Sequence, residues 1–317
     1  MKNTAQTITV LALITSVLGL SPVAHSQPLE VELPTEMENS ETEALPPLPI
    51  EMENAEEEDL PPLPVELDDR PRESLPNPSS LPSDADSLPL KPQMTAVEWY
   101  NQGVDHLESG NYQKAISSFA QAIELAPGDA DAYYNRGYAY HLLNNHEAAI
   151  ADYTEAVKRN SEFSDAYGNR CSAYYHTQDF DAAIADCTQA IRLNPENANF
   201  YISRGNAYDD SGKTEAAISD YDEALRLDDS NAQAYYNRGL AYNRLKELEK
   251  AVEDYTLSLN LNGEFAEAYY NRGITYFQLE QPEKAIADLK QAADLFEKQG
   301  RTESYQGALQ AIEFIEQ

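Results

Sequence analysis

Basic residues are scarce in this chain. Its 317 residues include 22 Lys and Arg against 55 Asp and Glu, which gives a formal net charge of −33. Nucleic acids and anionic membrane surfaces carry charge of the same sign, so neither is an expected partner. A neutral or basic polypeptide is the class of partner that this charge favours.

Cysteine and histidine are also rare, which limits the chemistry that the chain can carry. There are two Cys and five His, and no Ser or Cys nucleophile has a recognisable base partner in the sequence. His141 and His176 are the one pair that we considered as metal ligands, but no cysteine or acidic residue accompanies them at ligand spacing. We therefore expect no enzyme activity, no cofactor and no metal.

Long apolar runs are absent except near the N-terminus. Ile8–Leu20 is mostly apolar and too short for a comfortable membrane span. Small residues at Ala24 and Ser26 fit a signal-peptidase site, so residues 1–26 are predicted to be a signal peptide, with an uncleaved anchor as the alternative. The mature form is expected to have no transmembrane span. The expected location is the periplasm, cell envelope or extracellular space, or the thylakoid lumen if the source is a cyanobacterium.

Residues 27–94 have a different composition from the rest of the chain. They hold 14 of the 18 prolines and 18 acidic residues against three basic ones. Such a segment cannot bury enough apolar surface to offset its ordering entropy, so a disordered acidic linker is predicted. The run Leu45-Pro-Pro-Leu-Pro49 returns as Leu60-Pro-Pro-Leu-Pro64. A polyproline II ligand is one reading of these runs, and a stiff spacer is the reading we favour.

Residues 96–299 consist of six consecutive copies of one 34-residue unit. Its marks are an aromatic at position 4, a small residue at position 8 and alanine at position 20. The units are 96–129, 130–163, 164–197, 198–231, 232–265 and 266–299. Within each unit the apolar positions fall three or four apart, which predicts two helices joined by a turn. One such hairpin cannot bury its apolar face alone, so the units must stack.

This pattern resembles the tetratricopeptide repeat family. The departures are a proline at position 32 only at Pro127 and Pro195, and Arg at position 7 in five units where the family usually has Leu. The resemblance implies an all-α superhelical solenoid of antiparallel helix pairs that serves as a non-catalytic protein-interaction scaffold. Residues 301–317 are predicted to form a capping helix, with Tyr305, Leu309, Ile312 and Ile315 on one face. The count is then thirteen helices and no strand.

The resemblance also implies a binding groove, because the first helix of each repeat lines the concave side in this family. Carried over, the groove residues are Asn101, Asn135, Asn169, Asn237, Asn271, Tyr100, Tyr134, Tyr236, Tyr270, Asp209 and Asp210. A row of asparagine amides can pair with the backbone of an extended client segment, and the two aspartates would favour basic residues in it. Replacing the asparagines is then expected to leave helicity and melting nearly unchanged.

Two alternatives accompany this interpretation of the groove. Asparagine at position 6 is also compatible with a wet helix face that binds nothing. The second function considered is a carbohydrate- or peptidoglycan-binding accessory protein of the cell envelope, which would place the groove tyrosines on sugar rings.

Two sets of paired residues complete the prediction. Repeats two to six carry Arg136, Arg170, Arg204, Arg238 and Arg272 at position 7 and Asp152, Asp186, Asp220, Asp254 and Asp288 at position 23. The first repeat has neither, which predicts a pair within each repeat rather than between neighbouring repeats. Independent solvent-facing charges copied by duplication are the alternative. Cys171 and Cys187 replace the small and the aromatic residue of one repeat and stand opposite each other. Export permits a disulfide there, and a reduced pair in the core is the alternative.

Overall fold

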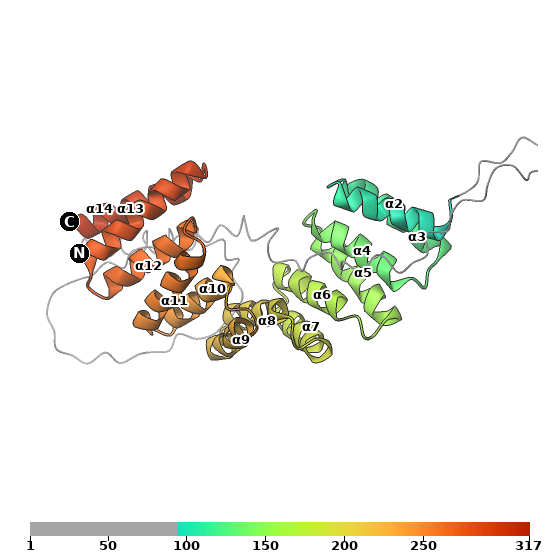
Figure 1. Cartoon of the computed structure of the whole chain (residues 1–317), viewed down its shortest axis with the longest axis horizontal. Helices are drawn as coiled ribbons and strands as arrows, with labels where there is room; N and C mark the ends of the chain where they lie inside the picture. The colour runs from blue at the N-terminus through green and yellow to red at the C-terminus, as the bar shows by residue number, and fades with distance from the viewer. Residues whose placement is uncertain (1–93) are drawn as a thin grey trace, which may run out of the picture. The chain divides into compact units, whose positions relative to one another are not determined.

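The computed structural model describes residues 94–317, drawn in colour in Figure 1. The predicted signal peptide and the acidic linker up to residue 93 lie outside these residues. Between residues 94 and 317, thirteen helices follow one another and no strand occurs. The expected all-α fold is confirmed for this part of the chain.

Each repeat contributes two helices. The first helices are α2 (Ala96–Glu108), α4 (Ala130–His141), α6 (Ser164–His176), α8 (Ala198–Asp210), α10 (Ala232–Arg244) and α12 (Ala266–Gln278). The second helices are α3 (Tyr112–Leu125), α5 (His146–Arg159), α7 (Phe180–Leu193), α9 (Thr214–Leu227), α11 (Leu248–Leu261) and α13 (Pro282–Lys298). A last helix, α14 (Thr302–Glu316), follows. None of these helices is both long and apolar enough to cross a membrane.

Side-chain caps start many of the helices. Asp129, Asn197 and Asn231 are of the residue types that cap helices, and each accepts a hydrogen bond from a backbone N–H in the first turn of its helix. Thr95 forms a capping box with Glu98 at the start of α2. The helix starts therefore follow from local sequence.

The turn inside each repeat has one fixed geometry. Position 15 adopts a positive φ in all six repeats, at Gly110, Asn144, Gln178, Gly212, Lys246 and Glu280. Glycine is present only at Gly110 and Gly212, where this backbone region carries no Cβ penalty. In the first repeat the N–H of Asn111 then reaches back to the carbonyl of His106 at 2.8 Å, which closes the end of the helix.

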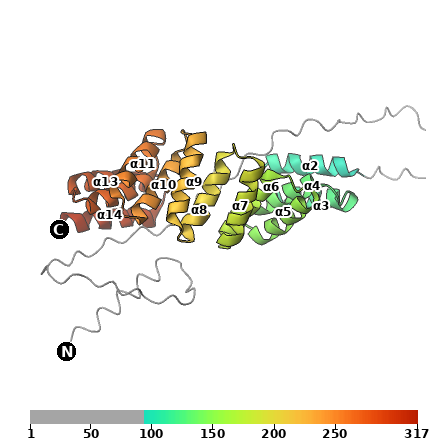
Figure 2. The same cartoon turned by 90° about the horizontal axis from the view of Figure 1, so that it is seen from below.

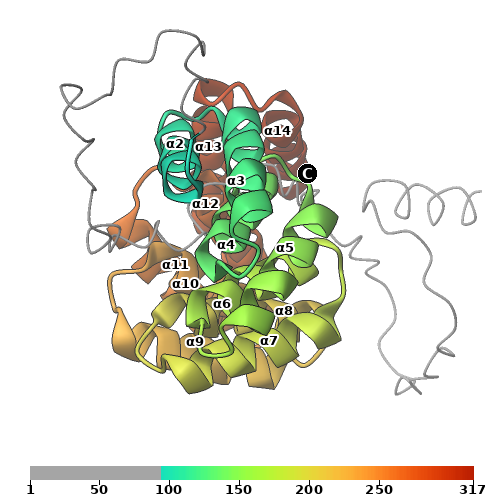
Figure 3. The same cartoon turned by 90° about the vertical axis from the view of Figure 1, so that its right-hand side faces the viewer.

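Residues 94–254 and residues 255–317 form two compact units. In the first, the two helices of each repeat pack together, and each second helix also contacts the next first helix (Figure 2). The first helices touch in sequence as well, from α2 through α4, α6 and α8 to α10. Figure 3 has α2 to α5 toward the viewer. One side of this unit is therefore built of first helices only, and we call it the first-helix face.

Small residues let the two helices of a repeat approach closely. Ala149 is fully buried, and a Cβ on Gly137 would crowd the Tyr153 ring. The position-24 side chains Phe119, Tyr153 and Tyr221 fill the interior and are at most 1% exposed. The core thus consists of aromatics packed against alanine and glycine.

The last helix packs against α13, and three of the four residues predicted to face the core do so: Ile312 is buried, and Tyr305 and Ile315 are half-buried against the same cluster. Leu309 is 39% exposed, whereas Ser304, Ala308, Ala311 and Ile312 are buried. Three of these four are small, which lets α14 lie close to Leu295 and Phe296 of α13. The predicted helix is correct, and the expectation that Leu309 faces the core is wrong, because close approach selects the small residues.

Candidate protein-interaction face

The first-helix face of residues 94–254 contains positions 2, 5, 6, 9, 12 and 13 of α2, α4, α6, α8 and α10. Positions 5, 6, 12 and 13 hold the residues that the family resemblance assigns to the groove. The structure shows which of their side chains are used inside the protein and which remain accessible.

The position-6 asparagines are mostly buried. Asn135, Asn169 and Asn237 are 5%, 0% and 9% exposed, whereas Asn101, which has no preceding repeat, is exposed. Nδ2 of Asn135 donates to the Tyr100 hydroxyl at 2.9 Å, and Nδ2 of Asn169 donates in the same way to Tyr134 at 2.9 Å. Asn271, in the second unit, is half-buried.

These bonds explain the asparagine and tyrosine rows. Position 5 of one repeat and position 6 of the next face each other, and a buried tyrosine hydroxyl requires a hydrogen-bonding partner. The expectation that the asparagines form a solvent-facing row is wrong for Asn135, Asn169 and Asn237, because they are buried. The expectation that they can be replaced without effect on melting stays a prediction, and these hydrogen bonds argue against it. The asparagine amides join adjacent repeats.

The asparagine–tyrosine link is interrupted where both partners change. The third repeat has Gly168 at position 5, and the fourth has Ser203 at position 6. At the next junction Ile202 offers no hydroxyl, and Nδ2 of Asn237 donates instead to Oδ1 of Asn206 at 2.9 Å. The paired change of positions 5 and 6 between neighbouring repeats was the signal in the sequence that could have revealed the link.

The position-5 tyrosines do not present their rings to a ligand. Tyr100, Tyr134 and Tyr270 are 4%, 1% and 1% exposed, and Tyr236 is half-buried. Burial raises the pKa of Tyr270 to about 12, and that of Tyr134 still further. Their role in the structure is packing between helices.

The acidic pair of the fourth repeat is partly neutralised by the fifth. Arg244 lies 3.1 Å from Oδ2 of Asp209 and 3.2 Å from Oδ1 of Asp210. The hydroxyl of Tyr175 donates to the other oxygen of Asp210 at 2.6 Å. Burial raises the pKa of Asp209 above its usual range, while Arg244 opposes that shift. Asp210 remains exposed, so it is the member of the pair that a ligand can reach.

Position 2 supplies a second polar row on the same face. Asp131, Asp165, Asn199 and Gln233 come from four successive first helices, and all four are half-buried. Burial raises the pKa of Asp165. Ser172 and Asn206, at position 9, are also half-buried. These side chains, together with Asp210, form the accessible polar surface of the face.

The predicted arginine–aspartate pairs occur in every repeat where both residues are present. The bonds join Arg136 to Asp152, Arg170 to Asp186, Arg204 to Asp220, Arg238 to Asp254 and Arg272 to Asp288. In the first repeat Ser118 donates to Gln102 at 3.0 Å in the same place. The alternative of independent surface charges is therefore excluded.

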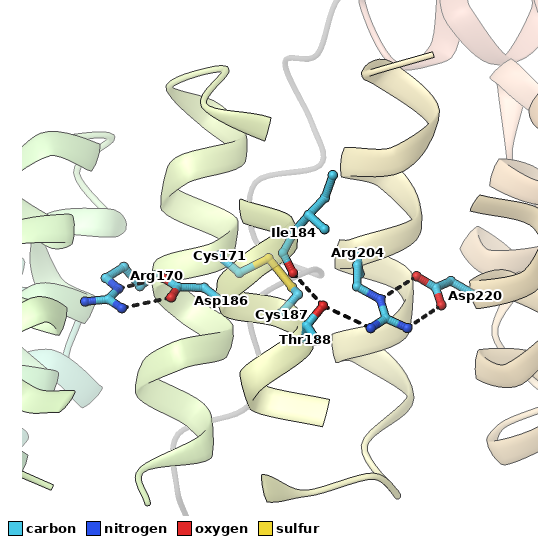
Figure 4. The surroundings of a disulfide bond; sticks show 8 residues. All are labelled: Arg170, Cys171, Ile184, Asp186, Cys187, Thr188, Arg204 and Asp220. Carbon is cyan, nitrogen blue, oxygen red and sulfur yellow. Dashed lines mark hydrogen bonds and ion pairs between the residues drawn. A yellow bond between two sulfur atoms is a disulfide. The ribbon is translucent and has the colours of Figure 1, made fainter. Parts of the chain in front are cut away.

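The arginines also bond to the preceding repeat, which the sequence did not indicate. Nη1 of Arg204 donates to the Thr188 hydroxyl at 3.1 Å, as Figure 4 shows. Arg170 and Arg272 reach Thr154 and Thr256 in the same way. These three arginines thus join the two helices of their own repeat and also bond to the second helix of the preceding repeat.

The third repeat is built differently from the others. A disulfide joins Cys171 and Cys187, whose Cα atoms are 5.4 Å apart (Figure 4). Phe200 of the next repeat lies over Gly168 and is 1% exposed. Position 3 is alanine in four of the other repeats, so a large residue from the fourth repeat fills the space that small residues leave in the third.

His141 and His176, considered as a metal pair from the sequence, come together with a third imidazole. Their ring centroids are 5.6 Å apart, and His146 lies 4.9 Å from His141. His146 and His176 are stacked, with an interplanar angle of 10°. Lone pairs of parallel rings do not converge on one point. Accordingly, no group of three potential ligands in residues 94–317 is arranged to hold a metal ion.

Family models cover more than half of the chain. Models described as tetratricopeptide repeat match residues 100–159, 187–219, 164–197, 232–265 and 266–299. A model described as TPR repeat matches residues 205–246. Three of these ranges coincide with repeats read from the 34-residue period. No curated protein matches the sequence at a significant level.

Solved structures with the same fold include YrrB, described as a TPR protein with an unusual peptide-binding site. It is 25% identical over 61% of this chain and 96% of its own, with a TM-score of 0.50. The APC/C hetero-tetramer Cut9–Hcn1 is 18% identical over 69% of this chain and 43% of its own, with a TM-score of 0.58. Pseudomonas aeruginosa pilF is 19% identical over 67% of this chain and 95% of its own, with a TM-score of 0.57. The last two show the fold alone.

Proposed function

Because the chain belongs to the tetratricopeptide repeat family, we propose that it is a non-catalytic scaffold that binds an extended polypeptide segment along the first-helix face. The observation that carries this proposal is the accessible polar row at position 2, repeated on four adjacent helices. Equal spacing along a stack of helices suits a ligand that is itself extended. The described peptide-binding site of YrrB supports the same class of ligand.

The charges of the face favour a neutral or basic segment. Asp131, Asp165 and Asp210 are accessible on it, and Arg244 is already bonded to Asp209 and Asp210. A basic ligand gains from this field, and its rate of association rises at low ionic strength. The buried asparagines and tyrosines first assigned to the groove contribute by fixing the repeats. Asn101 is exposed, and Tyr236 and Asn271 are half-buried.

We do not propose the glycan-binding alternative. It required tyrosine rings to lie against sugar rings, and Tyr100, Tyr134 and Tyr270 are buried. No other observation favours a sugar ligand.

The proposal includes export of the protein. The apolar run before residue 26 has the pattern of a signal peptide, and a disulfide such as Cys171–Cys187 persists in oxidising compartments. Mass spectrometry of the native protein tests this part. A mature N-terminus at Gln27 with no free thiol is expected, and an intact Met1 with two free thiols contradicts it.

The binding proposal is tested with a library of unstructured peptides that differ in net charge. The face variant Asp131→Asn/Asp165→Asn should bind the tightest lysine-rich peptide at least tenfold more weakly than the unaltered chain. The matched control Glu147→Gln/Asp181→Asn removes two exposed charges from the second helices of the same repeats. Its affinity should stay within twofold of the unaltered chain. Equal losses in both variants, or none in the face variant, would overturn the proposal.

A further inference from the structure

Three imidazoles meet at the junction of the second and third repeats. His141 ends α4, His146 begins α5 and His176 ends α6. The ring of His141 stands edge-on to those of His146 and His176, with centroids 4.9 and 5.6 Å apart. His146 and His176 are stacked with centroids 4.5 Å apart. The cluster therefore brings the turn of one repeat against the first helix of the next.

The surroundings of His141 suit a neutral ring. The side chain is 4% exposed, and its Nδ1 has no hydrogen-bond partner in the described structure. Besides the two imidazoles, Tyr153 of α5 faces it at 6.5 Å. Tyr175 of α6 lies against His176 and donates to Asp210 of α8. The carboxylate nearest to the cluster along this chain of contacts is therefore already bonded.

No opposite charge is placed to stabilise a protonated His141. Burial and the two neighbouring imidazoles lower the pKa of His141 to about 3, and no charged group of α2 or α3 contributes. A buried imidazolium without a counter-ion is costly, and a second charge on a touching ring adds repulsion. Proton uptake must therefore accompany exposure of the ring to water.

We propose that His141, His146 and His176 form an acid-sensitive joint, packed when neutral, which opens the contact between α4–α5 and α6 on acidification. An opened His141 titrates with an ordinary histidine pKa of about 6.5. Between pH values of about 3 and about 6.5, the open state therefore binds more protons than the closed state. For each proton taken up, the equilibrium constant for opening rises about tenfold with each unit that the pH falls below 6.5.

The joint goes beyond the proposed function and does not depend on it. The Arg136–Asp152 and Arg170–Asp186 pairs and the Cys171–Cys187 disulfide lie within single repeats. Acidification to about pH 5.5 should leave these intra-repeat bonds in place, so the repeats should separate locally rather than unfold individually.

Hydrogen exchange of the full chain at about pH 7.5 and about pH 5.5, corrected for the intrinsic rate, tests the joint. Protection of residues 138–150 and 170–180 should fall at least tenfold at the lower pH, while α9 keeps its protection. His141→Leu places at this position the residue that the first repeat has at Leu107, and it should abolish the loss. His106→Leu is the control for removal of a histidine outside the cluster, and it should respond like the unaltered chain.

Two results would overturn the joint. One is unchanged protection of residues 138–150 in the unaltered chain at the lower pH. The other is an equal loss of protection in the His141→Leu variant. If circular dichroism shows that His141→Leu does not fold, His146→Gln/His176→Gln takes its place and should reduce the acid-induced loss at least threefold. An undiminished loss in that double variant also contradicts the proposal.

Discussion

Arg204 donates to both carboxylate oxygens of Asp220, from Nε at 2.8 Å and from Nη2 at 2.7 Å. The pair joins α8 to α9 and is only 17% and 8% exposed at its two side chains. The hydrogen bonds to Asp220 raise the pKa of Arg204, so the guanidinium stays charged at any ordinary pH. The bidentate geometry is of the strong, directional kind.

Removing one partner of this pair should be worse than removing both. Arg204→Met or Asp220→Leu leaves a largely buried charge alone, which costs about 3–5 kcal/mol at full burial and less at this partial exposure. The double variant should recover at least about 1 kcal/mol relative to the sum of the singles. Urea denaturation of the four proteins measures this coupling.

The pair Arg226–Glu223 is the control for that cycle. It joins residues three apart on the surface of α9, with side chains 64% and 37% exposed, so its coupling should be indistinguishable from zero. Additive losses at Arg204 and Asp220 would show that the buried pair contributes no more than this surface pair.

Asn135→Ala should destabilise the protein although asparagine is an ordinary surface residue. The change removes the Nδ2 group that donates to the Tyr100 hydroxyl at 2.9 Å. Losing a buried hydrogen bond costs about 1–3 kcal/mol. Asn101→Ala changes the same position in the first repeat, where the side chain is exposed, and should alter stability by less than about 0.5 kcal/mol. Equal effects in thermal melts would contradict the linking role of Asn135.

The effect of Gly168→Ala on stability should depend on whether Phe200 is present. In the unaltered chain Gly168→Ala places a Cβ against the Phe200 ring and should destabilise. Phe200→Ala alone removes a buried ring and should cost about 3–5 kcal/mol. In the Phe200→Ala background, Gly168→Ala should become neutral or stabilising. Chemical denaturation of these three variants tests the coupling, and an unchanged cost of Gly168→Ala would contradict it.

Reduction should weaken the third repeat. The disulfide joins two residues that are 16 apart in the sequence. Closing a loop of that length stabilises the folded protein by about 3 kcal/mol in the chain-entropy estimate. Urea unfolding with and without a phosphine reductant measures the difference. The Cys171→Ala/Cys187→Ala variant is the control, since the reductant should leave its midpoint unchanged. A midpoint that does not respond to reductant in the unaltered chain would contradict this role.

The helices and the arginine–aspartate pairs were predictable because they depend on spacing within one repeat. Position 7 and position 23 meet whenever the two helices of a hairpin pack, and the presence of both residues in five repeats identified the pair. The capping residues Asp129 and Asn231 act on their own first turns for the same reason. Such contacts need no knowledge of how repeats stack.

Contacts between repeats were much harder to predict. Burial of Asn169 by Tyr134, and entry of Phe200 over Gly168, depend on which side chains adjacent hairpins turn toward each other. His146 was missed because it stands at position 17, outside the repeat pattern, and it meets His176 only through stacking. The exposure of Leu309 on α14 was not predicted, because helical spacing alone does not say whether small or large residues make the closest contact.

Photo-crosslinking can show whether a polypeptide binds along the first-helix face. A photo-crosslinking residue placed at Asn199 or Ser172 reports on that face, and the same residue at Ala151 or Ala185 reports on the exposed side of the second helices. The measurement is the yield of crosslinks to the tightest-binding lysine-rich peptide from the library, read by mass spectrometry. We expect crosslinks from Asn199 and Ser172 and almost none from Ala151 and Ala185. Crosslinks confined to Ala151 and Ala185 would contradict binding along the first-helix face.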